Sequence, residues 1–318
     1  MKSFARRGSI ILLFAACIVS VSRRALAANE RGVLLRAAII YVAPDTTSTK
    51  MANMERGMEV VALERSGQWL HVLGVIPPPF GDQAREISGW MLDKGVITAS
   101  TSNGDQLLFG EAVHCENEAS RRGGRKGAAA DAQHLYARAA EYFPNSSLAA
   151  EAAYRAADIR WQIDEADVAS RLSRTGDSRE RPQIEEEPMR RVIKKFPHTR
   201  WADLAAFHLI ENKLCADWQQ QSHCPMKEAQ LYEKYAAEYP QSPALAEALY
   251  DAAWRYAALV EIYPADGQGD KVQQASERAI ANAEKVIARN ASTDWNTRAQ
   301  LLIYMVRNHI PVYGNKIE

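Results

Sequence analysis

The chain has 318 residues, of which 47% are hydrophobic and 25% are charged, proportions typical of a folded globular protein. Basic and acidic residues number 39 each, so the balance excludes a strongly basic or strongly acidic chain. The length suits two domains, or one domain followed by a repeat array.

Residues 1–28 have the three parts of a secretory signal peptide. A positively charged start precedes the apolar stretch Ile10–Val21, and the small-residue sequence ALAA follows at Ala25–Ala28. The apolar stretch is too short to span a bilayer comfortably, and Arg23 and Arg24 interrupt it, which disfavours an uncleaved anchor helix. We therefore expect export and cleavage near Ala27.

A second interpretation of the N-terminus depends on Cys17. The sequence LFAAC resembles a lipobox, with Phe14 where leucine is usual, and it predicts cleavage before Cys17 and lipid attachment there. The apolar IVSVS that follows Cys17 is unlike the polar start of most lipoproteins. Both interpretations place the protein in the periplasm or cell envelope, and they differ in whether it is lipid-anchored.

Removal of the signal changes the net charge. Cleavage after Ala28 removes five basic residues and no acidic ones, which leaves 34 basic and 39 acidic residues and a net charge of −5. We expect such a protein to bind neither nucleic acid nor an anionic membrane surface. The sequence has no second long apolar segment, so we predict no transmembrane span after signal cleavage.

Residues 33–98 alternate between apolar and polar positions, which is typical of β-strands. Five short strands are predicted, at LLRAAIIYVAP, GMEVVALE, WLHVLGV, SGWML and GVIT, with Ser66 and Gly67 forming a hairpin turn. Three consecutive prolines keep PPPFGDQAREI out of any central strand. Five short strands within one such segment predict a small closed barrel, because closure removes exposed sheet edges.

The segment resembles a bacterial SH3-like domain. The resemblance rests on a glycine before the second strand, a tryptophan at the start of the third, and a Gly-Trp pair in the fourth, which here are Gly57, Trp69, Gly89 and Trp90. A Pro-rich insertion at Ile76–Ile87 departs from the family pattern.

Relatives of this domain bind cell-wall peptides or act as spacers within envelope proteins. The resemblance therefore implies a peptide or peptidoglycan contact, for which Tyr41, Trp69 and Trp90 are the candidate residues, because aromatic faces bury much area at a small cost in entropy. In the competing interpretation Trp69 and Trp90 fill the barrel.

Residues 99–127 form a predicted linker. ASTSNGDQ is polar and rich in turn-forming residues, and LLFGEAVHCENEAS has the composition of a short helix. The sequence RRGGRKG at 121–127 favours a solvated hinge over a contact with an anion, since glycines interrupt its charges.

Residues 128–308 repeat one phrase three times. A proline follows an aromatic residue, a polar residue comes just after, and a second aromatic stands ten positions beyond the proline. The prolines are Pro144, Pro197 and Pro240. Each proline ends one helix, and Ser146, Thr199 or Ser242 provides the N-cap of the next. Each phrase therefore predicts the turn of a helical hairpin, and stacked hairpins share a continuous core.

The phrases resemble tetratricopeptide-type repeats, especially those of outer-membrane assembly lipoproteins and cell-division coordinators. The prolines are farther apart than the usual repeat length, so extra segments intervene, and a fourth, degenerate turn is expected within 288–306. Residues 309–318 form a tail. The resemblance implies an all-α solenoid that docks an extended peptide or a partner helix on its concave face.

Two cysteines nine positions apart, Cys215 and Cys224, suggest a disulfide in an exported chain. Zinc held with His208 and His223, or free thiols, are the alternatives. A disulfide leaves Cys115 unpaired or bonded to another molecule.

The sequence as a whole predicts a multidomain protein, a small all-β SH3-like barrel followed by an all-α tetratricopeptide-like solenoid. We expect an exported adaptor of the cell envelope with no reaction and no cofactor of its own, which contacts the cell wall or a protein through the barrel and docks a protein partner on its helices. The alternatives are an unrecognised cell-wall hydrolase or zinc-binding protein, and a lipid-anchored structural spacer.

Overall fold

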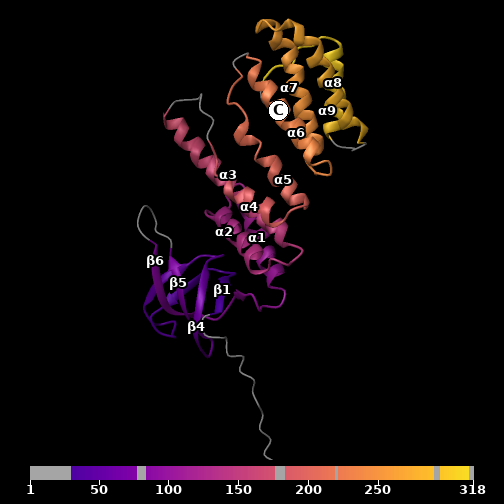
Figure 1. Cartoon of the computed structure of the whole chain (residues 1–318). Helices are drawn as coiled ribbons and strands as arrows, with labels where there is room; N and C mark the ends of the chain where they lie inside the picture. Colours follow the sequence, from indigo (N-terminus) through magenta and orange to yellow (C-terminus); the bar gives the residue numbers. More distant parts are fainter. Residues whose placement is uncertain (1–29, 77–83, 176–182, 219–220, 290–293, 315–318) are drawn as a thin grey trace, which may run out of the picture.

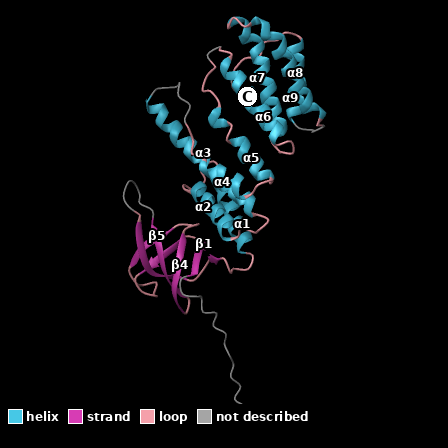
Figure 2. Cartoon of the chain, in the orientation of Figure 1, coloured by secondary structure: helices cyan, strands magenta, loops and turns pink. Residues whose placement is uncertain are grey.

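The computed structural model describes residues 30–76, 84–175, 183–218, 221–289 and 294–314. An antiparallel sheet forms the first part of the chain and helices form the rest (Figure 1), and the two kinds of structure are separated along the molecule (Figure 2). The predicted signal peptide and Cys17 lie outside the described residues, as does most of the Pro-rich insertion.

The sheet has seven strands in the described part of the chain. They are β1 (Glu30–Leu34), β2 (Ala38–Tyr41), β3 (Lys50–Met54), β4 (Glu59–Ser66), β5 (Trp69–Ile76), β6 (Arg85–Leu92) and β7 (Val96–Thr98). Their order in space is β3-β2-β6-β5-β4-β1-β7, and every neighbouring pair is antiparallel.

This arrangement differs from the predicted five strands. The predicted opening strand corresponds to β2, β1 comes before it, and β3 lies between the first two predicted strands. β1 pairs with β4 and β7, while β2 pairs with β3 and β6. The predicted hairpin turn is confirmed, because Ser66 and Trp69 face each other across it.

Helices occupy the remainder. They are α1 (Gly104–Ala119), α2 (Ala128–Tyr142), α3 (Ala149–Thr175), α4 (Glu187–Lys195), α5 (Arg200–His208), α6 (His223–Glu238), α7 (Leu245–Ala265), α8 (Val272–Ala288) and α9 (Asp294–Arg307), with short 3-10 turns η1 (Glu211–Lys213) and η2 (Gly269–Lys271). The short helix expected between the sheet and the repeats is α1. No helix in the described residues is long and apolar enough to cross a membrane.

The three repeated phrases are turns between helices, as the sequence predicts. Pro144 lies between α2 and α3, Pro197 between α4 and α5, and Pro240 between α6 and α7. Thr199 is the N-cap of α5, and its Oγ1 accepts a hydrogen bond from the N–H of Ala202 at 3.2 Å.

The other two predicted caps act one turn earlier than expected. The hydroxyls of Ser146 and Ser242 accept hydrogen bonds from the N–H groups of Leu148 and Ala244, which precede α3 and α7. Both turns are closed by a backbone hydrogen bond, and the helices begin only after those turns.

The sheet and the first helices share one hydrophobic core. Val33 of β1 and Ile97 of β7 are buried in the same cluster as Leu108 of α1 and Leu135 of α2. A second contact is polar, because Nη1 of Arg56 donates to a carboxylate oxygen of Glu111 on α1 at 2.9 Å. This shared core fixes the sheet against α1 and α2.

Farther along the chain, three more clusters follow in succession. One joins α3 to α4 and α5, and the next joins α5 to α6 and α7. The last contains residues of α6, α7, α8 and α9. The molecule is therefore elongated, with the sheet at one end and α8 and α9 at the other (Figure 1).

Candidate functional site

A groove of about 440 Å³ lies over α3, with α2 and α4 on its two sides. Its floor consists largely of alanines that face it from α2 and α3, and we call it the alanine groove. The floor alanines are Ala137, Ala140, Ala153, Ala156 and Ala157. Small side chains leave the helix backbones accessible to a close approach by another chain, so the groove has the form of a docking site.

The rim of the alanine groove carries more basic than acidic groups. Arg160 of α3 and Arg191 and Lys195 of α4 line it, and Glu141 is the acidic residue that does so. Apolar side chains of Val192 and Phe196 complete the wall on the α4 side. The sequence does not predict this site, because its residues come from three successive helices whose packing against one another creates the groove.

The three aromatic residues predicted to bind a ligand lie on the sheet face opposite the core of the sheet. Ile40, Leu70 and Met91 belong to that core, and Tyr41, Trp69 and Trp90 are their neighbours in the chain. Adjacent residues in a strand point to opposite faces, and neither tryptophan belongs to that buried cluster.

Exposure differs among these aromatics. Tyr41 and Trp69 pack edge to face with ring centroids 5.6 Å apart, and both are buried. Trp90 is half-buried and pairs with Tyr41 across β2 and β6. Its ring stacks on that of His71, with the ring centroids 4.9 Å apart. The accessible part of the aromatic face is therefore the Trp90–His71 pair, of which the sequence predicts only the tryptophan.

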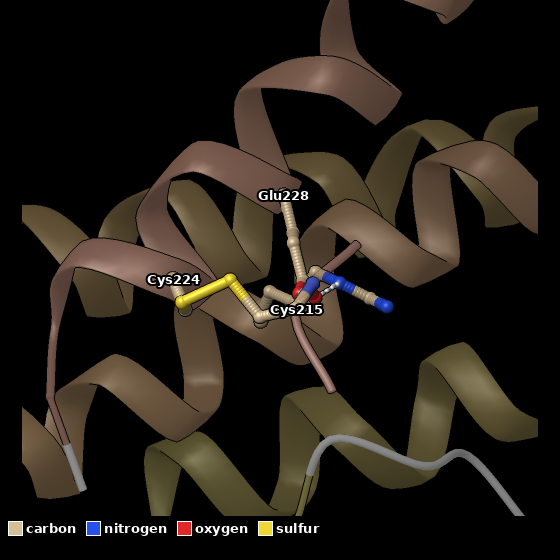
Figure 3. The surroundings of a disulfide bond; sticks show 4 residues. Cys215, Cys224 and Glu228 are labelled. Carbon is tan, nitrogen blue, oxygen red and sulfur yellow. Dashed lines mark hydrogen bonds and ion pairs between the residues drawn. A yellow bond between two sulfur atoms is a disulfide. The ribbon is translucent and has the colours of Figure 1, made fainter. Parts of the chain in front are cut away.

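Cys215 and Cys224 form a disulfide, with their Cα atoms 6.1 Å apart (Figure 3). The bond joins the loop after η1 to the first turn of α6. Glu228 lies one turn farther along α6, and its Oε1 accepts a hydrogen bond from the N–H of Cys215 at 2.8 Å. The loop is therefore held to α6 by a covalent bond and a hydrogen bond.

Glu228 also belongs to a buried charge cluster. Nε of Arg255 on α7 donates to Oε2 of Glu228 at 2.8 Å, and the Arg255 guanidinium lies 4.6 Å from the centre of the Tyr232 ring. Asp251, one turn away on α7, approaches Arg255 at 3.6 Å, and burial raises the pKa of its carboxyl to about 7. The charges of the cluster are buried and paired with one another.

The two histidines considered as zinc ligands do not join the cysteines. His208 contacts Asp158 at 3.6 Å and packs against Trp161, while His223 is exposed at the start of α6. In the described ranges, no group of three or more His, Cys, Asp or Glu residues is arranged to hold a metal ion.

Cys115, the cysteine expected to remain unpaired, is a free thiol buried in the core shared by the sheet and α1. Nη1 of Arg56 lies 3.4 Å from its sulfur. Burial raises the pKa of the thiol above its ordinary value, which disfavours the reactive thiolate. The surroundings of Cys115 are those of a structural residue.

Comparison with known proteins adds little. No protein-family model matches the chain. No curated protein matches it with significance. Two solved structures that match are the "DHF58 filament" (17% identity, 64% of this chain and 91% of that chain, TM-score 0.23) and the "DHF119 filament" (18% identity, 65% and 93%, TM-score 0.23). At that TM-score the matches carry no argument about fold or function.

Proposed function

We propose that the protein is an exported, non-enzymatic adaptor of the bacterial cell envelope. In this proposal the sheet is an SH3-like barrel that contacts the cell wall, and the helices are a tetratricopeptide-like solenoid that docks a protein partner. The observation that carries the proposal is the alanine groove, a preformed concave surface on the helical part of the molecule.

Two further features support the proposal. The disulfide between Cys215 and Cys224 fits an oxidising compartment such as the periplasm. The half-buried Trp90, stacked on His71, offers an aromatic surface for a peptide or a wall glycan on the sheet. The helical part and the sheet thus each provide a surface for a separate partner.

Protein docking is tested by site-specific photo-cross-linking of the full chain in cells. A photoreactive amino acid replaces Ala140 on the groove floor, and in the control it replaces Lys194, an exposed residue of α4 that does not line the groove. We expect one discrete covalent adduct with position 140 and none with position 194. Identical patterns at both positions, or no adduct at either, would refute the docking function.

Wall binding is tested by co-sedimentation of the mature chain, residues 29–318, with purified sacculi. The full mature chain is required because the sheet shares its core with α1 and α2. We expect Trp90→Ala to reduce the pelleted fraction and Tyr304→Ala, a change at an exposed aromatic of α9, to leave it unchanged. Equal sedimentation with and without sacculi would exclude the wall as a partner.

A further inference from the structure

We propose that the alanine groove binds an acidic segment of a protein partner, one in which Asp or Glu residues alternate with small apolar residues. The proposal rests on the adaptor function above and specifies the chemistry of its partner. It follows from the floor of the groove, the charges on its rim and the overall charge of the chain.

The floor of the groove offers a small apolar surface to a partner. Ala137 and Ala140 on α2 and Ala153 on α3 are only partly buried, so their methyl groups remain open to the groove. Val192 and Phe196 extend this apolar surface along α4. Apolar side chains of a partner that cover this surface remove it from water, which provides a favourable, non-directional contribution to binding.

The basic rim of the groove favours a negatively charged partner. Arg160, Arg191 and Lys195 are all exposed at the groove. Arg160 pairs with Asp164 at 2.9 Å and Arg191 with Glu187 at 3.5 Å, both one turn away on the same helix. Exposed pairs of this kind contribute little to stability, so the two arginines are able to exchange them for a partner's carboxylates.

Lys195 makes no ion pair in the part of the chain that the structure describes, in contrast to the two arginines. The mature chain carries a net charge of −5, and the basic rim therefore departs in sign from the molecule around it. A basic surface on an acidic protein steers an acidic partner to that surface.

Glu141, the acidic residue that lines the groove, does not neutralise the positive charge of the rim. Its carboxylate pairs with Arg138 on the same helix and with Arg31 of β1 at 3.4 Å. Glu59 pairs with the same two arginines, so these four residues form a neutral group at the edge of the groove. Among the described residues that line the groove, the three rim cations therefore outnumber the acidic groups.

The test uses two fluorescein-labelled synthetic peptides and the mature full chain. One peptide alternates Glu with Ala, and its counterpart has Lys at every Glu position. Fluorescence anisotropy measures the dissociation constant of each peptide at low and at high ionic strength. We expect the acidic peptide to bind more tightly than the basic one, and its binding to weaken as salt screens the rim.

The variant Arg160→Glu/Arg191→Glu/Lys195→Glu reverses the rim. The matched control, Arg190→Glu/Lys194→Glu/Lys234→Glu, reverses three exposed cations that do not line the groove. We expect the rim variant to weaken binding of the acidic peptide by about tenfold or more, because three ion pairs are lost, and the control to change it by less than about twofold.

Two outcomes would overturn the proposal. One is equal binding of the two peptides, or equal losses in the rim variant and the control. The other is a dimer of the chain in sedimentation equilibrium that the rim variant abolishes. Such a dimer would show that a second copy of the chain occupies the groove. A specific cross-link from position 140 to a different protein, together with either outcome, would refute the acidic partner and leave the adaptor function intact.

Discussion

Glu228 and Arg255 form an ion pair inside the helical array. The side chain of Glu228 is 1% exposed and that of Arg255 is 4% exposed, so neither charge is solvated by bulk water. Each charge is compensated by hydrogen bonds, since Glu228 accepts from both Arg255 and the N–H of Cys215. Such a pair matters chiefly through what its disruption leaves behind, which is one uncompensated buried charge.

Removal of one member of the pair is predicted to be costly. We expect Glu228→Ala to lower the free energy of unfolding by about 3–5 kcal/mol. Glu284→Ala, which breaks an exposed pair with Arg307, should lower it by at most about 1 kcal/mol. Urea denaturation followed by circular dichroism measures both. Equal losses in the two variants would contradict the structural account of the buried pair.

The loop between α5 and α6 connects two parts of the helical array. At its start Asn212 is buried and its side-chain amide donates to the carbonyl oxygen of Ile184, which precedes α4. Near its end Ser222 donates to a carboxylate oxygen of Asp266, which follows α7. The loop is thus tied to both sides, and the disulfide joins Cys215, which lies between the two attachments, to Cys224 in the first turn of α6.

The disulfide is predicted to stabilise this element. It closes a loop with a sequence separation of 9, for which chain entropy gives a contribution of about 2–3 kcal/mol. We expect Cys215→Ala/Cys224→Ala to lose about that amount in urea denaturation. A reducing agent should destabilise the wild-type protein by a similar amount and leave the double variant unchanged. A urea midpoint of the wild-type protein that does not change with reductant would contradict the prediction.

At the scale of the whole molecule, the joint between the sheet and α2 depends on a close backbone approach at Gly57. Gly57 has φ +73°, a left-handed conformation that side chains disfavour. A Cβ atom there would lie 2.6 Å from Cβ of His134 and 3.1 Å from the backbone N of Leu135, both on α2. The glycine therefore meets two needs, a turn before β4 and contact with a helix.

Alanine substitutions are predicted to distinguish the cost of the left-handed backbone at Gly57 from the cost of its contact with α2. Gly57→Ala and Gly67→Ala should each lose about 1–2 kcal/mol of unfolding free energy from the left-handed backbone. Gly67 has φ +60°, and a Cβ atom there would meet nothing within 4 Å, so it shows the backbone cost alone. We expect a further loss of about 1–3 kcal/mol for Gly57→Ala because α2 must shift. Equal losses in urea denaturation would show that the joint tolerates the methyl group.

Features that depend on neighbours in the chain follow from the amino-acid sequence alone. Pro144, Pro197 and Pro240 mark helix turns because proline has no N–H to continue a helix, and each of the three comes just after a helix end. The hairpin turn at Ser66 and Gly67 follows from the same kind of local rule. The disulfide is the favoured interpretation of two cysteines nine positions apart, and the structure contains it.

The sheet–helix joint and the alanine groove, in contrast, arise from tertiary packing. Arg56 and Glu111 are 55 positions apart, and no periodic pattern predicts that they meet. The groove unites alanines and basic residues of α2, α3 and α4, whose helices are ordinary when each is considered alone. Local rules specify how each segment folds, whereas a site exists only where packing brings separate segments together, because side-chain contacts do not depend on distance along the chain.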